Sequence, residues 1–461
     1  MRILLIAPNL CRDPYPVYPL GMSVIAGALT RAGHTVRQFD ALVHGPETLP
    51  QTIRTFHPDL IGFSIRNLDT VNSRSPEKGF LDTALRMIAC CRKETDVPIL
   101  LGGSGYSLLP ETILRLSGAD WGIAGEGEEA ILELVGELER GEKREPKIRM
   151  GRPGPQSGAV YPEDLLAFYR EETHILPIQT KRGCPYHCAY CTYPALEGRT
   201  IRERGNDDVL DQLEELARNH SDTMFYFVDA TFNDPAGEFR TFLKRMRERR
   251  ITLPFAAFLT PSHLTESDIA LMRTCGMIAA ELGIDASTDE TLRGLGKTFS
   301  FHDAAEKATR LLKSGIGVTT NVMFGGPGET VETVRAGIRN LRSLEPVHTL
   351  VFSGIRLFPN TPLYETARRE GKIPEGWDGI RELYYFADGL DPEQLHETLV
   401  AGFRDSRFCL YPPTPGTANC GSSTNSAMPD CAGSTPEERT HDRSPWHLVR
   451  DTGLQQRRDG V

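Results

Sequence analysis

The stretch KRGCPYHCAYC, residues 181–191, places Cys184, Cys188 and Cys191 in the spacing CxxxCxxC. A loop this short can bring three thiolates to one side of a small inorganic cluster. Cysteine thiolates are the usual ligands of iron–sulfur clusters, for which a complete set from the protein would be four. Three ligands from one loop, with no fourth cysteine nearby, would leave one iron open to bind another molecule.

The same loop carries an aromatic residue, Tyr190, directly before its last cysteine. In this respect it resembles the signature of the radical S-adenosylmethionine (SAM) enzymes. The resemblance implies a 4Fe–4S cluster on the three cysteines, whose fourth iron chelates the amino and carboxylate groups of SAM. The reduced cluster would cleave SAM to methionine and a 5′-deoxyadenosyl radical.

A zinc knuckle and a disulfide are the alternative uses of such cysteines. Zinc requires four ligands, and a second pair at C-x2–4-C spacing is missing from the sequence. Cys90 and Cys91 are adjacent, and Cys275 stands alone. The arrangement of cysteines therefore favours the iron–sulfur cluster.

Length and composition indicate a soluble protein of several domains. The chain has 461 residues, which suggests about two to four domains. A net charge of −10 does not favour a general affinity for nucleic acid, although a local basic pocket remains compatible with it. No apolar run approaches the ~18 residues needed to cross a bilayer. The N-terminus is too short for a signal sequence, so we expect a cytoplasmic protein with reduced thiols.

The first part of the chain alternates between short apolar runs and helical patterns. This alternation predicts a doubly wound parallel sheet over residues 1–140. The expected strands are residues 3–7, 34–39, 60–65, 98–101 and 121–124. The expected helices are residues 20–32, 52–56, 81–93, 110–116 and 128–138.

Glycine and small polar residues follow three of these strands, at Ser64–Asn67, Gly102–Gly105 and Gly125–Glu128. Ligands of such sheets bind beyond the carboxyl ends of the strands. Glycine lets the backbone approach a bulky ligand closely, although the same residues would also suit tight turns. The fingerprint G-x-G-x-x-G is absent after the first strand, so NAD is not favoured.

The order of these turns, together with Tyr18-Pro19-Leu20-Gly21, resembles the N-terminal domain of cobalamin-dependent radical SAM enzymes. The resemblance implies a Rossmann-like domain that binds cobalamin. The implied contacts are Leu20, Gly21, Ser64, Arg66, Asn67, Gly102, Gly103, Gly125, Glu126 and Gly127. The motif D-x-H-x-x-G of the methionine-synthase type, whose histidine ligates cobalt, is not matched because Asp40 and His44 have the wrong spacing. We therefore predict no cobalt-ligating histidine.

Arg66 lies in a stretch, Ser64–Asp69, that resembles the R-N-x-D sequence of the tryptophan C-methylating branch of this family. An arginine at the end of a central strand would point into the ligand crevice. A cation that cannot ligate cobalt would disfavour axial coordination from below and ease reduction to cob(I)alamin. Alternatively, Arg66 pairs with an amide, a propionate or a carboxylate such as Asp69. The local match does not identify tryptophan as the substrate.

Residues 141–176 have the composition of a linker, with one helical turn expected over Pro162–Tyr169. Residues 177–375 then repeat a strand–helix unit without a long break. The six units match the partial barrel of radical SAM enzymes, with the cluster at the carboxyl-end rim. The expected strands are residues 177–181, 224–228, 254–259, 279–284, 317–324 and 349–357. The expected helices are residues 207–217, 238–249, 266–275, 302–314 and 331–341.

The family resemblance also implies contacts to SAM at strand ends: Tyr190, Asp229, Asp285, Gly325, Gly326 and Arg356. Asp229 stands where the family's G-G-E region holds the amino group, although the literal G-G-E is missing. Asp285 replaces the glutamate of the family's G-I-E-S stretch, and it is one methylene shorter. Arg356 would meet the SAM carboxylate. For Asp229, Asp285 and Arg356 the alternative is a structural pair at the rim.

The end of the chain divides into two segments. Residues 376–411 are expected to form an extension with a helix over residues 392–403, of the kind that shapes a substrate site. Residues 412–461 are rich in Pro, Gly, Ser, Thr and Asn and are predicted to be a disordered tail. Cys420 and Cys431 lie in it, either as ligands of an auxiliary cluster or as unstructured residues.

Together these resemblances imply a cobalamin-dependent radical SAM C-methyltransferase with three cofactors: a 4Fe–4S cluster, SAM and cobalamin. It would move a methyl group from SAM via methylcobalamin to an unactivated carbon of a small-molecule or peptide substrate. An electron donor such as flavodoxin or ferredoxin is implied, and no side chain needs to act as an acid or base in hydrogen abstraction. The alternatives are a radical cyclase or ring-rearranging enzyme without methyl transfer, and a non-catalytic cobalamin sensor or carrier.

Overall fold

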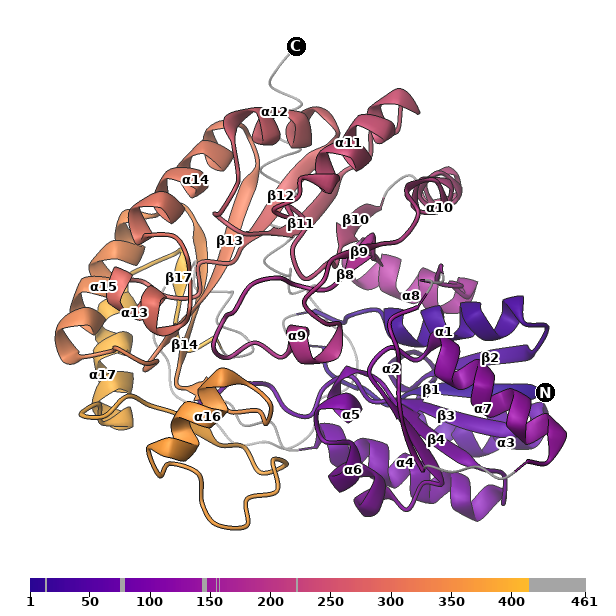
Figure 1. Cartoon of the computed structure of the whole chain (residues 1–461). Coiled ribbons are helices and arrows are strands. Elements are labelled where there is room, and N and C mark those ends of the chain that lie inside the picture. The colour runs from indigo at the N-terminus through magenta and orange to yellow at the C-terminus, as the bar shows by residue number, and fades with distance from the viewer. Residues whose placement is uncertain are drawn as a thin grey trace, which may run out of the picture.

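The computed structural model describes residues 1–12, 15–74, 79–142, 147–154, 156, 158–220 and 223–413. Two parallel sheets flanked by helices account for most of this part of the chain (Figure 1). The expected tail, with Cys420 and Cys431, lies outside the described residues apart from its first two positions. Within the described part, no helix has the length and apolar character of a membrane span.

The N-terminal sheet confirms the predicted doubly wound fold. Its six parallel strands run in the order β2-β1-β3-β4-β5-β6. Both faces are covered by helices, which explains why β1 is an almost unbroken apolar run. The strands are β1 Arg2–Ala7, β2 Thr35–Asp40, β3 Leu60–Ser64, β4 Ile99–Gly102, β5 Trp121–Ala124 and β6 Ile148–Met150. The helices are α1 Leu20–Arg31, α2 Ala41–His44, η1 Pro46–Thr48, α3 Leu49–Phe56, α4 Phe80–Glu94, α5 Ser104–Leu108, α6 Pro110–Ser117 and α7 Glu128–Arg140.

The segment predicted as a linker contains two regular elements. β6 pairs in parallel with β5 and completes the first sheet. Helix α8, Glu163–Thr173, has 11 residues, so the expected single turn over Pro162–Tyr169 is too short. It buries Leu165, Leu166 and Tyr169 on one face, and this apolar face stabilises it beyond one turn. β6 was not predicted from the sequence, because its three residues show no alternation of buried and exposed side chains. Only its backbone pairing with β5 defines it as a strand.

The second sheet has seven parallel strands in the order β17-β14-β13-β12-β11-β10-β7. The six predicted strands are present, and β17 adds a seventh from the C-terminal extension. The strands are β7 Ile175–Ile178, β10 Met224–Phe227, β11 Phe255–Leu259, β12 Met277–Leu282, β13 Gly317–Phe324, β14 His348–Ser353 and β17 Cys409–Leu410. The helices are α9 Tyr193–Leu196, α10 Asn206–Asn219, α11 Glu238–Glu248, α12 Glu266–Thr274, α13 Asp289–Gly294, α14 Phe301–Lys313, α15 Val331–Ser343, α16 Pro362–Arg369 and α17 Pro392–Phe403.

The last predicted barrel strand, residues 349–357, is interrupted at Gly354. This glycine has φ +73°, and a Cβ atom there would lie 2.5 Å from the Phe386 ring. The chain therefore leaves β14 and continues as β15, Ile355–Arg356, which pairs antiparallel with β16, Tyr384–Tyr385. The break directs Arg356 away from the barrel sheet.

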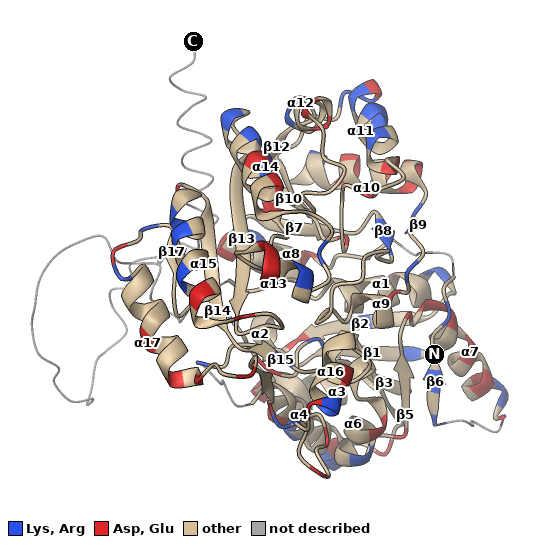
Figure 2. Ribbon diagram, turned by 60° about the vertical axis from the view of Figure 1, so that its left-hand side comes forward, with Lys and Arg blue, Asp and Glu red and all other residues tan. Residues whose placement is uncertain are grey.

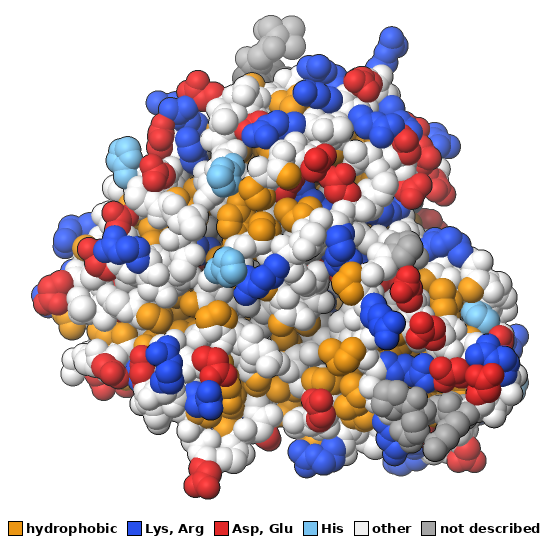
Figure 3. Space-filling model, in the orientation of Figure 1, with side chains coloured by type: hydrophobic (Ala, Val, Ile, Leu, Met, Phe, Trp, Pro, Cys, Tyr) orange, Lys and Arg blue, Asp and Glu red, His pale blue; other side chains and the backbone are white. Residues whose placement is uncertain are grey.

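The two halves pack through one continuous apolar core. Leu5 of β1, Leu166 of α8 and Phe225 of β10 belong to the same cluster of buried side chains. Charged residues of both signs are interspersed over the outer helices (Figure 2). Apolar side chains also reach the surface along the middle of the face shown in Figure 3, between the N-terminal domain and the barrel.

Candidate functional site

A cavity of about 660 Å³ lies between the two sheets. Its volume falls within the range of small-molecule and cofactor sites. The N-terminal domain contributes the ends of β1, β3, β4 and β5, and the barrel contributes residues of β7, β10, β11 and α9. Nine of the ten residues predicted to contact cobalamin line it, and Asn67 is the exception. The nine are Leu20, Gly21, Ser64, Arg66, Gly102, Gly103, Gly125, Glu126 and Gly127.

The two glycines at the end of β4, Gly102 and Gly103, have different surroundings. Gly103 has φ +99°, and a Cβ atom there would lie 2.5 Å from the backbone oxygen of Ile65. This glycine is therefore required by the protein's own packing. At Gly102 an added Cβ atom would meet only the Ile123 oxygen at 3.8 Å, an ordinary contact. The open space beside Gly102 fits the predicted close approach of a ligand.

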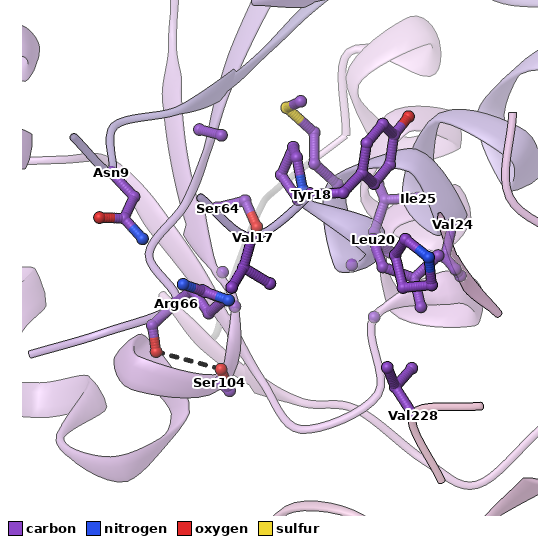
Figure 4. A pocket seen from close by; sticks show the side chains of 18 of the residues that line it. Asn9, Val17, Tyr18, Leu20, Val24, Ile25, Ser64, Arg66, Ser104 and Val228 are labelled. Carbon is purple, nitrogen blue, oxygen red and sulfur yellow. Dashed lines mark hydrogen bonds between the residues drawn. The ribbon is translucent and has the colours of Figure 1, made fainter. Parts of the chain in front are cut away.

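Arg66 extends its guanidinium into the cavity, toward Val17 (Figure 4). Its backbone oxygen accepts a hydrogen bond from Ser104 Oγ at 3.1 Å. No described residue forms a hydrogen bond or ion pair with its guanidinium. Burial lowers the pKa of Arg66. A half-buried cation that has no hydrogen-bonding or ion-pair partner among the described residues is costly, which suits a position that a ligand completes.

Asp69, the alternative partner of Arg66, pairs with Arg356 instead. Arg356 Nε donates to Asp69 Oδ2 at 2.7 Å, and the two side chains are 2% and 4% exposed. The other guanidinium nitrogens donate to the backbone oxygens of Leu357 and Gly379. This arrangement leaves the expected contact between Arg356 and the SAM carboxylate without support. The pair instead fastens the loop after β3 to the barrel.

Glu126 lines the cavity and also connects it to the cysteine loop. Its carboxylate accepts hydrogen bonds from Arg182 at 3.2 Å and from Arg202 Nη1 at 2.8 Å. Arg182 also pairs with Glu128 at 2.7 Å. Because Arg182 ends β8, Lys181–Arg182, directly before Gly183 and Cys184, these ion pairs hold the turn after β5 against the start of the loop.

The cysteine loop is held by its backbone. Ala189 N donates to Leu295 O at 2.9 Å, and Leu363 N donates to Ala189 O at 2.8 Å. Cys184 is buried, whereas Cys188 and Cys191 are half-buried. The pKa of Cys191 is raised to about 12, mainly by burial and in part by the nearby thiols of Cys188 and Cys184. Neutral thiols of this kind release protons when they bind a metal.

All three cysteines of the predicted cluster lie in one short loop, residues 184–191. All three are free thiols, and no three Cys, His, Asp or Glu side chains among the described residues are grouped closely enough to share one metal ion. Zinc gathers its ligands around a single atom, whereas a 4Fe–4S cluster binds each thiolate through a different iron. The support for the predicted cluster is therefore the CxxxCxxC spacing, which offers one thiolate to each of three irons.

A buried lysine, Lys297, lies beside this loop and was missed by sequence reasoning. Its ammonium forms an ion pair with Asp285, and it lies 5.8 Å from the centre of the Tyr190 ring. Burial opposes its charge, but Asp285 and Cys188 raise the pKa of Lys297 beyond its ordinary value. Burial and the nearby carboxylate of Asp285 raise the pKa of Tyr190. Lys297 follows α13 in a short turn with no recognisable motif, so only the fold reveals it.

Asp229 is almost completely buried, and its carboxylate accepts hydrogen bonds from the backbone before the cysteine loop. It accepts hydrogen bonds from Thr180 N at 2.7 Å, Thr180 Oγ1 at 2.5 Å and Lys181 N at 3.2 Å. These bonds fix the backbone that leads into the cysteine loop. They agree with a structural role for Asp229, the alternative to a contact with SAM. The turn that contains Gly325 is held by Glu329, which accepts from Gly325 N at 3.2 Å and from Thr333 Oγ1 at 2.6 Å.

Burial raises the pKa of Glu329 from 4.5 to about 7, which predicts a pH dependence of stability. Below about pH 4.5 the carboxyl is protonated in both states, so it contributes nothing. As the pH rises toward 7 it ionises only in the unfolded chain, which lowers stability by about 1–3 kcal/mol. Glu329→Gln should therefore gain stability relative to the native chain between pH 5 and pH 8, measured by urea unfolding. A difference that does not change with pH would contradict this.

Comparison with protein families identifies both halves of the chain. Residues 12–135 match the B12 binding domain, and residues 178–341 match the radical SAM superfamily. The tryptophan 2-C-methyltransferase of Streptomyces laurentii is 24% identical over 82% of this chain and 75% of its own length. The anaerobic magnesium-protoporphyrin IX monomethyl ester cyclase of Rubrivivax gelatinosus is 23% identical over 90% of this chain and 79% of its own length.

Two solved structures share the architecture. The radical S-adenosylmethionine methyltransferase TsrM from Kitasatospora setae, with cobalamin and a 4Fe–4S cluster bound, has a TM-score of 0.78 and 24% identity. The match covers 89% of this chain and 92% of TsrM. The cobalamin-dependent S-adenosylmethionine radical enzyme OxsB has a TM-score of 0.67 and 13% identity, over 88% of this chain and 66% of OxsB. At these identities the likeness shows a common fold.

Proposed function

We propose that this chain, which belongs to the cobalamin-dependent radical SAM enzymes, transfers a methyl group from SAM via cobalamin to an unactivated carbon of a small-molecule or peptide substrate. The observation that carries the proposal is the shared cavity. It opens between the strand ends of the B12-binding domain and the barrel wall, and Glu126 links its edge to the cysteine loop. The methyltransferases among its relatives support the same reaction class.

When bound, the 4Fe–4S cluster, SAM and cobalamin supply the electron, the methyl group and its carrier. Cys184, Cys188 and Cys191 hold the cluster. Lys297, beside that loop, offers a cation for the carboxylate of SAM in place of Arg356. The apolar lining of the cavity excludes water from the reacting groups. An electron donor such as flavodoxin or ferredoxin completes the system.

Arg66, whose guanidinium enters the cavity, is proposed to contact bound cobalamin and would offer its cobalt no ligating atom. A guanidinium has donors but no lone pair to offer, whereas a neutral histidine has a ring nitrogen that coordinates metals. Arg66→His should therefore add nitrogen splitting to the electron paramagnetic resonance spectrum of bound cob(II)alamin. Arg66→Lys is the control, because an ammonium also lacks a lone pair. Identical spectra for all three proteins would place Arg66 elsewhere.

The decisive experiment is anaerobic reconstitution with iron, sulfide and hydroxocobalamin, followed by reductant, methyl-labelled SAM and an extract of candidate substrates. Label in a new product supports methylation. The similarity to the cyclase over most of this chain favours ring closure or rearrangement as the second candidate. That reaction would consume SAM without labelling the product. A protein that binds cobalamin but never cleaves SAM would be a sensor or carrier.

A further inference from the structure

The cavity has a polar corner to which both domains contribute. Gln179, Arg182 and Glu197 line it from the barrel side, and Glu126 lines it from the B12-binding domain. Glu197 directly follows α9 and is half-buried. Gln179 Nε2 donates to Glu197 Oε1 at 3.2 Å, and Gln179 Oε1 accepts from Arg182 Nε at 2.9 Å. Because Arg182 also donates to Glu126, the four side chains form one hydrogen-bonded network.

Glu197 also contacts the start of the cysteine loop. Its Oε2 accepts a hydrogen bond from Gly183 N at 3.1 Å. Gly183 directly precedes Cys184, the first of the three cysteines. Cys184 N in turn donates to the backbone oxygen of Gly198, the residue after Glu197, at 3.1 Å. The same short segment therefore lines the cavity and holds the first cysteine in place.

The carboxylate of Glu197 can accept further hydrogen bonds. Its two bonds come from neutral donors, the Gln179 amide and Gly183 N. Among the residues that the structure describes, no lysine or arginine forms an ion pair with it. A carboxylate accepts about four hydrogen bonds, so about two acceptor positions remain. Burial raises the pKa of Glu197, as expected for a charge that its surroundings compensate only in part.

An amide N–H of cobalamin is the donor that fits this corner. The corrin ring carries several primary amides at its rim, each with N–H donors. Ligands of a doubly wound sheet lie beyond the carboxyl ends of its strands, and Glu126 follows β5 at that edge. We propose that Glu197 accepts a hydrogen bond from one rim amide of cobalamin and so positions the corrin ring relative to the cysteine loop. This inference rests on the cobalamin binding that the proposed function requires, and not on methyl transfer.

The test uses cobalamins in which one rim amide has been hydrolysed to a carboxylic acid, with each positional isomer measured separately. Their dissociation constants are measured at pH 8 by equilibrium dialysis against the full chain carrying its reconstituted cluster. At the position that contacts Glu197, such a derivative places a carboxylate where the donor was. The native protein should bind that isomer about tenfold more weakly than the others, the size of one hydrogen bond to a charged group. Glu197→Gln should reduce this ratio to about two, because the glutamine amide can donate to the new carboxylate.

Glu203→Gln is the matched control. Glu203 lies in β9, Arg202–Glu203, opposite Lys181, and it is not among the residues that line the cavity, whereas Glu197 is. The change removes one negative charge from the same region, so a general electrostatic effect on the acid derivatives would appear here too. Its isomer ratio should equal that of the native protein. Equal binding of all isomers by the native protein, or a ratio that persists in Glu197→Gln, would overturn the proposal.

A separate measurement distinguishes this proposal from the proposed function. Transfer of the SAM methyl group to reduced, unmodified cobalamin needs no substrate and is followed by visible absorbance. If that transfer occurs in a protein without isomer preference, only the role of Glu197 is wrong. If isomer preference is present but the transfer is absent, the contact with cobalamin stands and the methyltransferase proposal fails.

Discussion

Cys188→Ala is expected to remain folded and to bind cobalamin, but to lose the iron–sulfur cluster. The loop backbone is fixed by hydrogen bonds from Ala189 N and Leu363 N that do not involve the thiol. Removing one of three thiolates leaves two protein ligands, too few to hold a cluster that normally has three or four. The measurement is the iron and sulfide content, with the visible absorbance of the cluster, after anaerobic reconstitution.

Cys90→Ala is the control for this experiment. Cys90 is a half-buried free thiol on α4, in the other domain. Its replacement should leave the full iron and sulfide content. Native content of iron and sulfide in Cys188→Ala would refute the assignment of Cys188 as a ligand. Because cobalamin binding is scored on the same samples, a general loss of folding would be recognised.

Arg356→Met should lower the free energy of unfolding by about 3–5 kcal/mol, because it leaves the Asp69 carboxylate buried without its cation. The variant also loses the bonds from the guanidinium to Leu357 and Gly379. Urea unfolding measures the loss. The affinity for cobalamin should fall as well, because the loop that this pair fastens carries Arg66.

Two further variants separate the ion pair from other effects. Arg356→Met combined with Asp69→Asn should recover part of the lost stability, because the remaining side chain is neutral. Arg368→Met removes an exposed partner of Glu365, at 2.7 Å, and should cost about 0–1 kcal/mol. If Arg356→Met costs no more than Arg368→Met, the buried pair does not stabilise the domain junction.

Regular elements with strong side-chain patterns were predictable from the sequence. The expected strand at residues 317–324 coincides with β13, whose residues alternate between buried and partly exposed positions. The helix expected at residues 392–403 coincides with α17. β6 and β17 were not predicted, because each is too short for a pattern and exists through pairing with a neighbouring strand.

The candidate site was predictable where a motif is local in the sequence. The three cysteines and the glycine turns are examples, since each set lies within a few residues of sequence and led to a prediction before the fold was known. Contacts between distant segments were not predictable. Asp69 and Arg356 are 287 residues apart in the sequence, yet they form a buried ion pair. Lys297 likewise becomes a candidate only through its neighbours in space.

The hydrogen bonds from Arg182 and Arg202 to Glu126 connect the barrel to the B12-binding domain, so the interface between the two domains depends on all three residues. A chimera that combined this B12-binding domain with the barrel of a relative would keep these contacts only if the relative carried arginines at the positions of Arg182 and Arg202. Without them, the nearly buried carboxylates of Glu126 and Glu128 would lack their cations, which is destabilising. Natural homologues that have lost the glutamate should therefore have changed the arginines as well, so that the two domains evolve as one unit.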